Sequence, residues 1–146
     1  MMQGGDGMLK FVTRSPDETE AAGAAVAAIC GATSFVALFG GLGAGKTAFV
    51  RGFAKALGFD GEVTSPTFAL VHEYTGGKFD IFHFDMYRIT SPEDLWSTGF
   101  FDYDGMGITI TEWSENIEDS LPDDCIRVSI AYGSDENERI ITAEGF

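Results

Sequence analysis

Residues 40–47 match the pattern G-x-x-x-x-G-K-[ST] in every position. The apolar run at 34–39 just before them predicts a buried strand, and a helical spacing of apolar residues begins at Lys46. A glycine-rich turn between a strand and a helix lets main-chain N–H groups surround a phosphate at the positive end of the helix dipole. This segment therefore favours an α/β fold that holds a nucleotide.

Each residue type in the motif has a chemical reason to be there. Lys46 supplies a point charge toward the β- and γ-phosphates, and the Thr47 hydroxyl is suited to Mg²⁺. The alternative is a glycine-rich turn that fits the pattern by chance, since the chain has 19 glycines. The position between strand and helix favours a phosphate loop. The predicted nucleotide-binding residues here are Gly41, Leu42, Gly43, Ala44, Gly45, Lys46 and Thr47.

Two apolar segments further along the chain end in an acid. Residues 81–85 end in Asp85, and residues 108–112 end in Glu112. If both are parallel strands beside the phosphate loop, both carboxylates face the phosphates, where one of them could hold the metal and its waters. The alternatives are a cap of the strand-end turn for Asp85 and an ordinary surface acid for Glu112. His83 is expected to be a core residue of its strand rather than a base or a ligand.

Residues 64–68 follow the second predicted helix, where phosphate-loop hydrolases keep the loop that senses the γ-phosphate. Ser65 and Thr67 are candidates for that role, and a plain proline turn explains the segment equally well. Arg88, just beyond Asp85, could reach a phosphate or form a structural salt bridge.

The remaining sequence predicts a succession of short elements in one domain over residues 8–146, after a flexible start at 1–7. Ser15 and Ser91 are each followed by proline, which predicts two helix starts. Helices are expected from 16 to about 30, from 46 to 57 and from 92 to about 99. Strands are expected at 9–13, 34–39, 67–74, 78–85, 108–112, 126–132 and 139–143. This order predicts a single P-loop NTPase domain of the α/β class, with a mixed, mostly parallel sheet covered by helices.

Charge and composition exclude several other classes. The chain has 9 basic and 23 acidic residues, a net charge of −14, which repels nucleic-acid phosphate. Direct binding of RNA is therefore not expected. No apolar run approaches the roughly 20 residues that cross a bilayer, and no secretory leader is visible, so a cytoplasmic protein without membrane association is predicted. Cys30 and Cys125 are expected to be reduced core thiols.

Taken together, the motifs resemble the TsaE (YjeE) family of bacterial ATPases, which acts in threonylcarbamoyladenosine modification of tRNA. The resemblance covers nearly the whole chain. At position 41, where members usually carry Asp or Glu, this chain has glycine, so that carboxylate is missing. The residues that carry the resemblance are Leu42-Gly43-Ala44-Gly45-Lys46-Thr47, Ser65-Pro66-Thr67-Phe68, His83-Phe84-Asp85-Met86-Tyr87-Arg88 and Glu112-Trp113-Ser114-Glu115.

The resemblance implies roles for individual residues. ATP would be bound through residues 43–47, with Mg²⁺ held by Thr47 and Glu112. Lys46, Asp85 and Glu112 would form the catalytic set, and Trp113 would act in switching or partner sensing. Further candidates, for the base or ribose side of the nucleotide, are Ser15, Thr19 and Arg139.

The resemblance also implies an accessory subunit that binds TsaD and TsaB and hydrolyses ATP to support repeated turnover on tRNA, without transferring the threonylcarbamoyl group itself. Contact with tRNA would come through these partners. No internal arginine finger is obvious, so hydrolysis in isolation is expected to be slow. Two alternatives are a small-molecule kinase, for which the few scattered basic residues after Lys55 provide no lid segment, and a switch that binds ATP without hydrolysing it.

Overall fold

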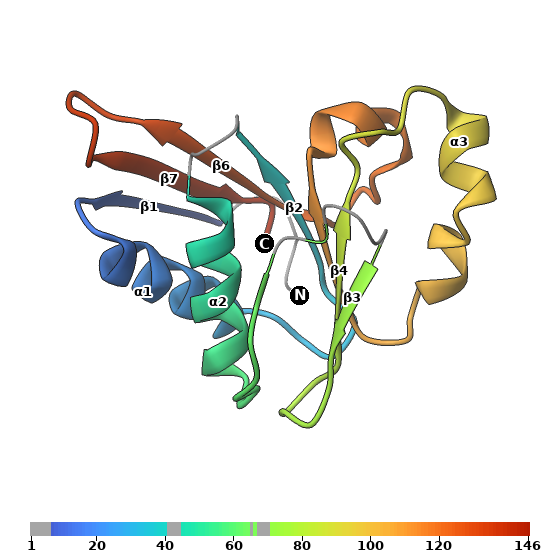
Figure 1. Ribbon diagram of the computed structural model, residues 1–146, viewed down its shortest axis with the longest axis horizontal. Coiled ribbons are helices and arrows are strands. Elements are labelled where there is room, and N and C mark those ends of the chain that lie inside the picture. The colour runs from blue at the N-terminus through green and yellow to red at the C-terminus, as the bar shows by residue number, and fades with distance from the viewer. Residues whose placement is uncertain (1–6, 41–44, 65, 67–70) are drawn as a thin grey trace.

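The structure is a computed structural model that describes residues 7–40, 45–64, 66 and 71–146 (Figure 1). Within these residues, seven strands form one sheet in the order β1-β7-β6-β2-β5-β4-β3. The strands are β1 (Met8–Thr13), β2 (Phe35–Phe39), β3 (Val71–Tyr74), β4 (Ile81–Asp85), β5 (Ile108–Glu112), β6 (Ile126–Tyr132) and β7 (Arg139–Glu144). The helices are α1 (Pro16–Ala27), α2 (Lys46–Ala56) and α3 (Pro92–Ser97), with 3₁₀ helices η1 (Phe100–Tyr103) and η2 (Ser114–Ser120).

The sheet is parallel at its centre and antiparallel at both sides. β6, β2, β5 and β4 are neighbours in parallel, whereas β1 and β7, β7 and β6, and β4 and β3 pair antiparallel. The predicted single α/β domain with a mixed sheet is thus confirmed, and its parallel part is the central four strands. Because β2, β5 and β4 run in the same direction, their carboxyl ends meet at one edge of the sheet.

Both predicted Ser-Pro helix starts are confirmed. Ser15 and Ser91 have extended backbones, and their hydroxyls accept hydrogen bonds from the N–H groups of Glu18 and Asp94, each at 3.1 Å. α1 ends at Ala27 rather than near residue 30 as predicted. After Ala27 the backbone bonds tighten to the i to i−3 type, with the Cys30 N–H donating to the Ala27 carbonyl, as the chain turns toward β2.

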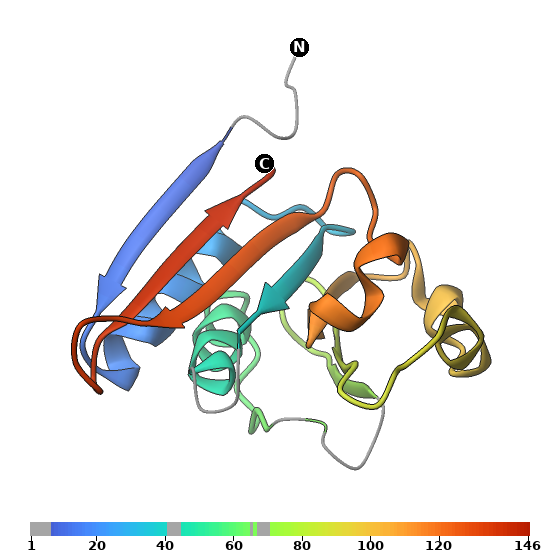
Figure 2. The same ribbon diagram turned by 90° about the horizontal axis from the view of Figure 1, so that it is seen from above.

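The strands separate two apolar cores by the alternation of their side chains. On one face, α1 and α2 pack together over side chains such as Val36 and Ile81 (Figure 2). Phe35 and Phe82 are next to Val36 and Ile81 in their strands and therefore face the other side of the sheet. There they pack in a second cluster, which includes Leu95 of α3. The apolar run of β2 is therefore buried on both sides, as expected of a central parallel strand.

Several predictions fall on residues outside the described ones: the start at 1–6, Gly41, Leu42, Gly43, Ala44, Ser65 and Thr67. The strand expected at 67–74 is described from Val71 onward. Cys30 and Cys125 are free thiols, half-buried and buried respectively, in agreement with the sequence. Among the helices in the described part of the chain, none has both the length and the apolar character needed to span a bilayer.

Candidate nucleotide-binding site

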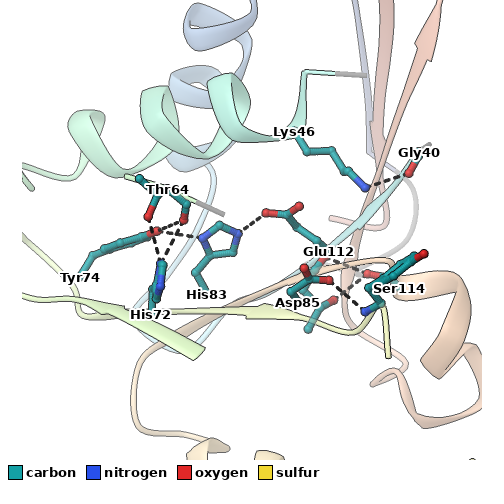
Figure 3. A network of polar contacts seen from close by, with 11 residues as sticks. Gly40, Lys46, Thr64, His72, Tyr74, His83, Asp85, Glu112 and Ser114 are labelled. Carbon is teal, nitrogen blue, oxygen red and sulfur yellow. Dashed lines mark hydrogen bonds and ion pairs between the residues drawn. The ribbon is translucent and has the colours of Figure 1, made fainter. Parts of the chain in front are cut away.

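Three strand ends and the start of α2 converge at one edge of the sheet (Figure 3). β2 leads into Gly40, β5 ends at Glu112 and β4 ends at Asp85, which is the register partner of Glu112. α2 begins at Lys46, and Gly45 before it has left-handed backbone angles (φ 97°, ψ 17°) that glycine adopts without strain. The structure thus brings together Lys46, Asp85 and Glu112, the three predicted catalytic residues.

Lys46 is a buried cation, with 6% of its surface exposed. Its amino group donates a hydrogen bond of 2.9 Å to the Gly40 carbonyl and lies 4.4 Å from the centre of the Trp113 ring. A carbonyl dipole and an aromatic face both attract an ammonium group, which offsets its loss of water. The amino group is therefore held where the two ends of the glycine-rich segment approach each other.

Glu112 is 4% exposed, so it is not an ordinary surface acid. Its Oε2 lies 2.5 Å from His83 Nε2, and because a carboxylate only accepts, the imidazole N–H is the donor. On the other side of the ring, His83 Nδ1 lies 2.9 Å from the Tyr74 hydroxyl, which also lies 3.1 Å from the Thr64 carbonyl. In the imidazolium form Nδ1 donates to Tyr74, and in the neutral form the Tyr74 hydroxyl is shared between Nδ1 and the carbonyl.

Asp85 both caps its turn and belongs to the site. Its Oδ1 accepts a hydrogen bond of 2.9 Å from the Tyr87 N–H, as the turn-cap interpretation predicts. Burial raises the pKa of Asp85 above its usual range, and repulsion by Glu112 adds to this, whereas the Tyr87 N–H and the charge of Lys46 lower it. Two carboxylates thus lie side by side, and the charge of Lys46 reaches that of Asp85.

The chain turns sharply directly after Glu112. Trp113 has left-handed backbone angles (φ 57°, ψ 43°), which are unfavourable for a residue with a Cβ. The buried hydroxyls of Thr111 and Ser114 contact each other at 2.7 Å, and the Ser114 hydroxyl also donates to the Thr111 carbonyl at 2.9 Å. These bonds hold the turn that places the Trp113 ring over Lys46.

Two side chains of η2 fasten this turn to the neighbouring strand ends. The Glu115 carboxylate accepts from the Gly40 N–H at 3.2 Å, and the Asn116 side-chain amide donates to the carbonyls of Met86 at 2.9 Å and Tyr87 at 3.2 Å. Sequence reasoning named Ser114 and Glu115 only as part of the motif that begins at Glu112, without assigning them a contact, and it did not name Asn116. Their position directly after the acid that ends β5 was the available signal.

The residues that were predicted to contact the base or ribose of the nucleotide lie around the start of α1. Ser15 caps α1, and Thr19 contacts the Thr13 hydroxyl at 2.8 Å. A Cβ on Gly45 would lie 3.7 Å from the Thr19 methyl group, so this turn of α1 adjoins the start of α2. Arg139 is the register partner of Thr13, and its guanidinium stacks on the Tyr132 ring at 4.2 Å.

Thr47 and Glu112 fit a magnesium ion by their donor chemistry. Both offer oxygen atoms, the ligand type that Mg²⁺ prefers, one from the second residue of α2 and one from the end of β5. In the residues that the structure describes, no group of three or more His, Cys, Asp or Glu side chains gathers into a metal cluster. Arg88 lines an open groove of about 750 Å³ beside Trp113 and Asn116.

Comparisons with known proteins agree with this geometry. The family described as "Threonylcarbamoyl adenosine biosynthesis protein TsaE" matches residues 13–141. The tRNA threonylcarbamoyladenosine biosynthesis protein TsaE of Bacillus subtilis is 40% identical over 139 residues, which cover 94% of this chain and 87% of the relative. The protein of the same name from Treponema pallidum is 37% identical over 136 residues, 92% of this chain and 100% of the relative.

A crystal structure of Bacillus subtilis YdiB, which has a P-loop fold, superposes with a TM-score of 0.77 at 33% identity. The superposition covers 99% of this chain and 88% of the other. The family match spans α1, α2 and the converging strand ends, and the superposition spans the whole sheet as well. The chain therefore belongs to the TsaE family, whose members take part in the biosynthesis of threonylcarbamoyladenosine in tRNA.

Proposed function

We propose that this chain binds Mg-ATP at the start of α2 and hydrolyses it slowly, as an accessory subunit for threonylcarbamoyladenosine formation by a TsaD–TsaB complex. The observation that carries the proposal is the convergence of Lys46, Glu112 and Asp85 at the edge where β2, β5 and β4 end. A cation at a helix start, opposite one buried and one half-buried carboxylate, suits a phosphate chain and its metal ion.

In this proposal, the backbone of residues 41–45 surrounds the phosphates and Lys46 pairs with the β- and γ-phosphates. Thr47 and Glu112 hold Mg²⁺, which neutralises phosphate charge when bound. Asp85, the second carboxylate, orients the attacking water. Ser15, Thr19 and Arg139 lie toward the nucleoside, because the first turns of α1 adjoin the start of α2.

Slow hydrolysis by the isolated chain is supported by the state of three of its five arginines. Arg14, Arg51 and Arg127 are each held by a carboxylate, of Glu138, Glu20 and Glu118 respectively. An arginine supplied to the γ-phosphate typically accelerates hydrolysis by about 10³- to 10⁵-fold. We therefore propose that the partner complex completes the site, with Trp113 and the segment containing Ser65 and Thr67 sensing the partner and the nucleotide. The acidic chain would reach tRNA through these partners, in the cytoplasm.

Calorimetry with Mg-ATP tests the binding part of the proposal. Lys46→Ala removes the charge at the start of α2 and is expected to weaken binding by at least tenfold, the loss typical of a charged hydrogen bond. Lys55→Ala, in the last turn of the same helix, is the matched control and is expected to bind like the wild type. Equal affinities of all three proteins, or no heat of binding with the wild type, would contradict the proposal.

A further inference from the structure

A line of buried polar contacts leads from Glu112 away from Lys46 (Figure 3). It runs from the carboxylate to His83 at 2.5 Å, from His83 to the Tyr74 hydroxyl at 2.9 Å, and from there to the Thr64 carbonyl at 3.1 Å. His83 is 0% exposed and Tyr74 is 3% exposed. The carboxylate at the end of β5 is therefore supported from β4, β3 and the segment after α2.

Packing alone does not account for a histidine at this place. Its register partner on β5 is Ile110, and its neighbour on the same face of β4 is Ile81, so the surroundings favour an aliphatic residue. A buried imidazole needs partners for both ring nitrogens, and Glu112 and Tyr74 provide them. In return, His83 gives the buried carboxylate of Glu112 a donor, without which its charge would be strongly unfavourable.

We propose that His83 is a positioning residue that fixes the orientation of the Glu112 carboxylate, and that Tyr74 fixes His83 in turn. The inference rests on the proposed function, in which Glu112 binds the Mg²⁺ of Mg-ATP. A glutamate side chain has three rotatable bonds, and a hydrogen bond to Oε2 fixes the plane of the carboxylate. The direction in which the carboxylate can bind a cation is then fixed before the nucleotide arrives, as outer partners do for other metal ligands.

His72 is a matched control for His83. The two residues are register partners on β3 and β4, and His72 Nδ1 lies 3.1 Å from the Thr64 carbonyl that also contacts Tyr74. In the part of the chain that the structure describes, the hydrogen bonds of His72 end on Thr64 and do not reach Glu112. A change at His72 therefore disturbs the same neighbourhood without touching the carboxylate.

The test measures how much Mg²⁺ improves nucleotide binding. A non-hydrolysable ATP analogue is titrated calorimetrically at one pH, once with Mg²⁺ and once with EDTA, and the ratio of the two affinities is compared. His83→Ala is expected to lower this ratio by about 10- to 100-fold, while the affinity in EDTA stays unchanged. For His83→Gln, whose amide still donates, and for Tyr74→Phe, the ratio is expected to fall by less. For His72→Gln the ratio is expected to equal that of the wild type.

Each outcome bears on the proposal. If the wild type gains affinity from Mg²⁺ and the variants His83→Ala, His83→Gln and Tyr74→Phe gain as much, the positioning role is wrong and the proposed function stands. Equal losses with Mg²⁺ and with EDTA leave the ratio unchanged, which means a structural role and also overturns the inference. If Mg²⁺ does not improve nucleotide binding by the wild type, both the positioning role of His83 and the proposed function are wrong. Thermal unfolding monitors folding, and if His83→Ala is unfolded, the two conservative variants decide.

Discussion

The Lys46 ammonium lies between two acceptors that carry no full negative charge, the Gly40 carbonyl and the Trp113 ring. A phosphate carries a full negative charge, which attracts an ammonium group more strongly than a carbonyl dipole or an aromatic face does. In the proposed complex the amino group therefore exchanges these contacts for the phosphates. The Trp113 ring, held by a left-handed turn directly after Glu112, would then lose the cation on its face.

This exchange predicts a fluorescence signal. The chain has two tryptophans, and Trp96 is 74% exposed, so a Trp96→Phe variant isolates the emission of Trp113. Saturating Mg-ATP analogue is expected to change that emission, and Lys46→Met is expected to abolish most of the change. If the Trp96→Phe protein binds the nucleotide by calorimetry but its emission spectrum stays the same, Lys46 does not leave the ring.

At the scale of elements, α1 and α2 approach each other so closely that glycine is required at their crossing. A Cβ on Gly23 would overlap the Phe49 carbonyl oxygen, and a Cβ on Gly52 would overlap the Glu20 carbonyl oxygen. Both obstacles are backbone atoms, which cannot rotate away. This close crossing sets where α1 stands against α2, and with it the proximity of Thr19 to Gly45.

Alanine at these positions is expected to reverse its usual effect. Inside a helix, Gly→Ala normally stabilises by about 1 kcal/mol. Gly52→Ala and Gly23→Ala are instead expected to lower the free energy of unfolding by about 1–3 kcal/mol, because the helices must move apart. Gly31→Ala, where nothing lies within 4 Å of the added methyl group, is expected to change it by less than about 0.5 kcal/mol. Urea denaturation measures all three, and a stabilised Gly52→Ala would refute the close crossing.

The elements were largely predictable because serine, proline and glycine mark their ends. The Ser-Pro starts of α1 and α3 and the apolar run of β5 were predicted to the residue. The 3₁₀ helix η2 was not predicted, since its irregular turns have no apolar period and it begins after Trp113, whose left-handed backbone no residue type announces. The part of His83 in the site was also missed, because it depends on contacts with Tyr74 and Glu112 that only the strand order creates.

At the scale of the whole molecule, the proposed function requires an acidic protein to bind a nucleotide and to act on tRNA, both of which are negatively charged. The net charge of −14 opposes both a nucleotide and a tRNA. In the proposed function, the first problem is met locally by Lys46, a buried cation at a helix start beside the ends of the parallel strands. The sequence was sufficient to predict this convergence, because parallel strands leave their carboxyl ends at one edge and the phosphate-loop motif directly follows one of them. The second problem is left to partner proteins in the proposed function.

Multiple-turnover formation of threonylcarbamoyladenosine on tRNA tests the central proposal most directly. The assay uses purified TsaD and TsaB with an excess of tRNA, and compares this chain with its Lys46→Ala and Lys55→Ala variants. Many rounds of modification per complex are expected with the wild type and with Lys55→Ala, and no stimulation is expected with Lys46→Ala. Equal turnover with Lys46→Ala, or no stimulation by the wild type, would contradict the proposal that ATP bound at the start of α2 drives the reaction.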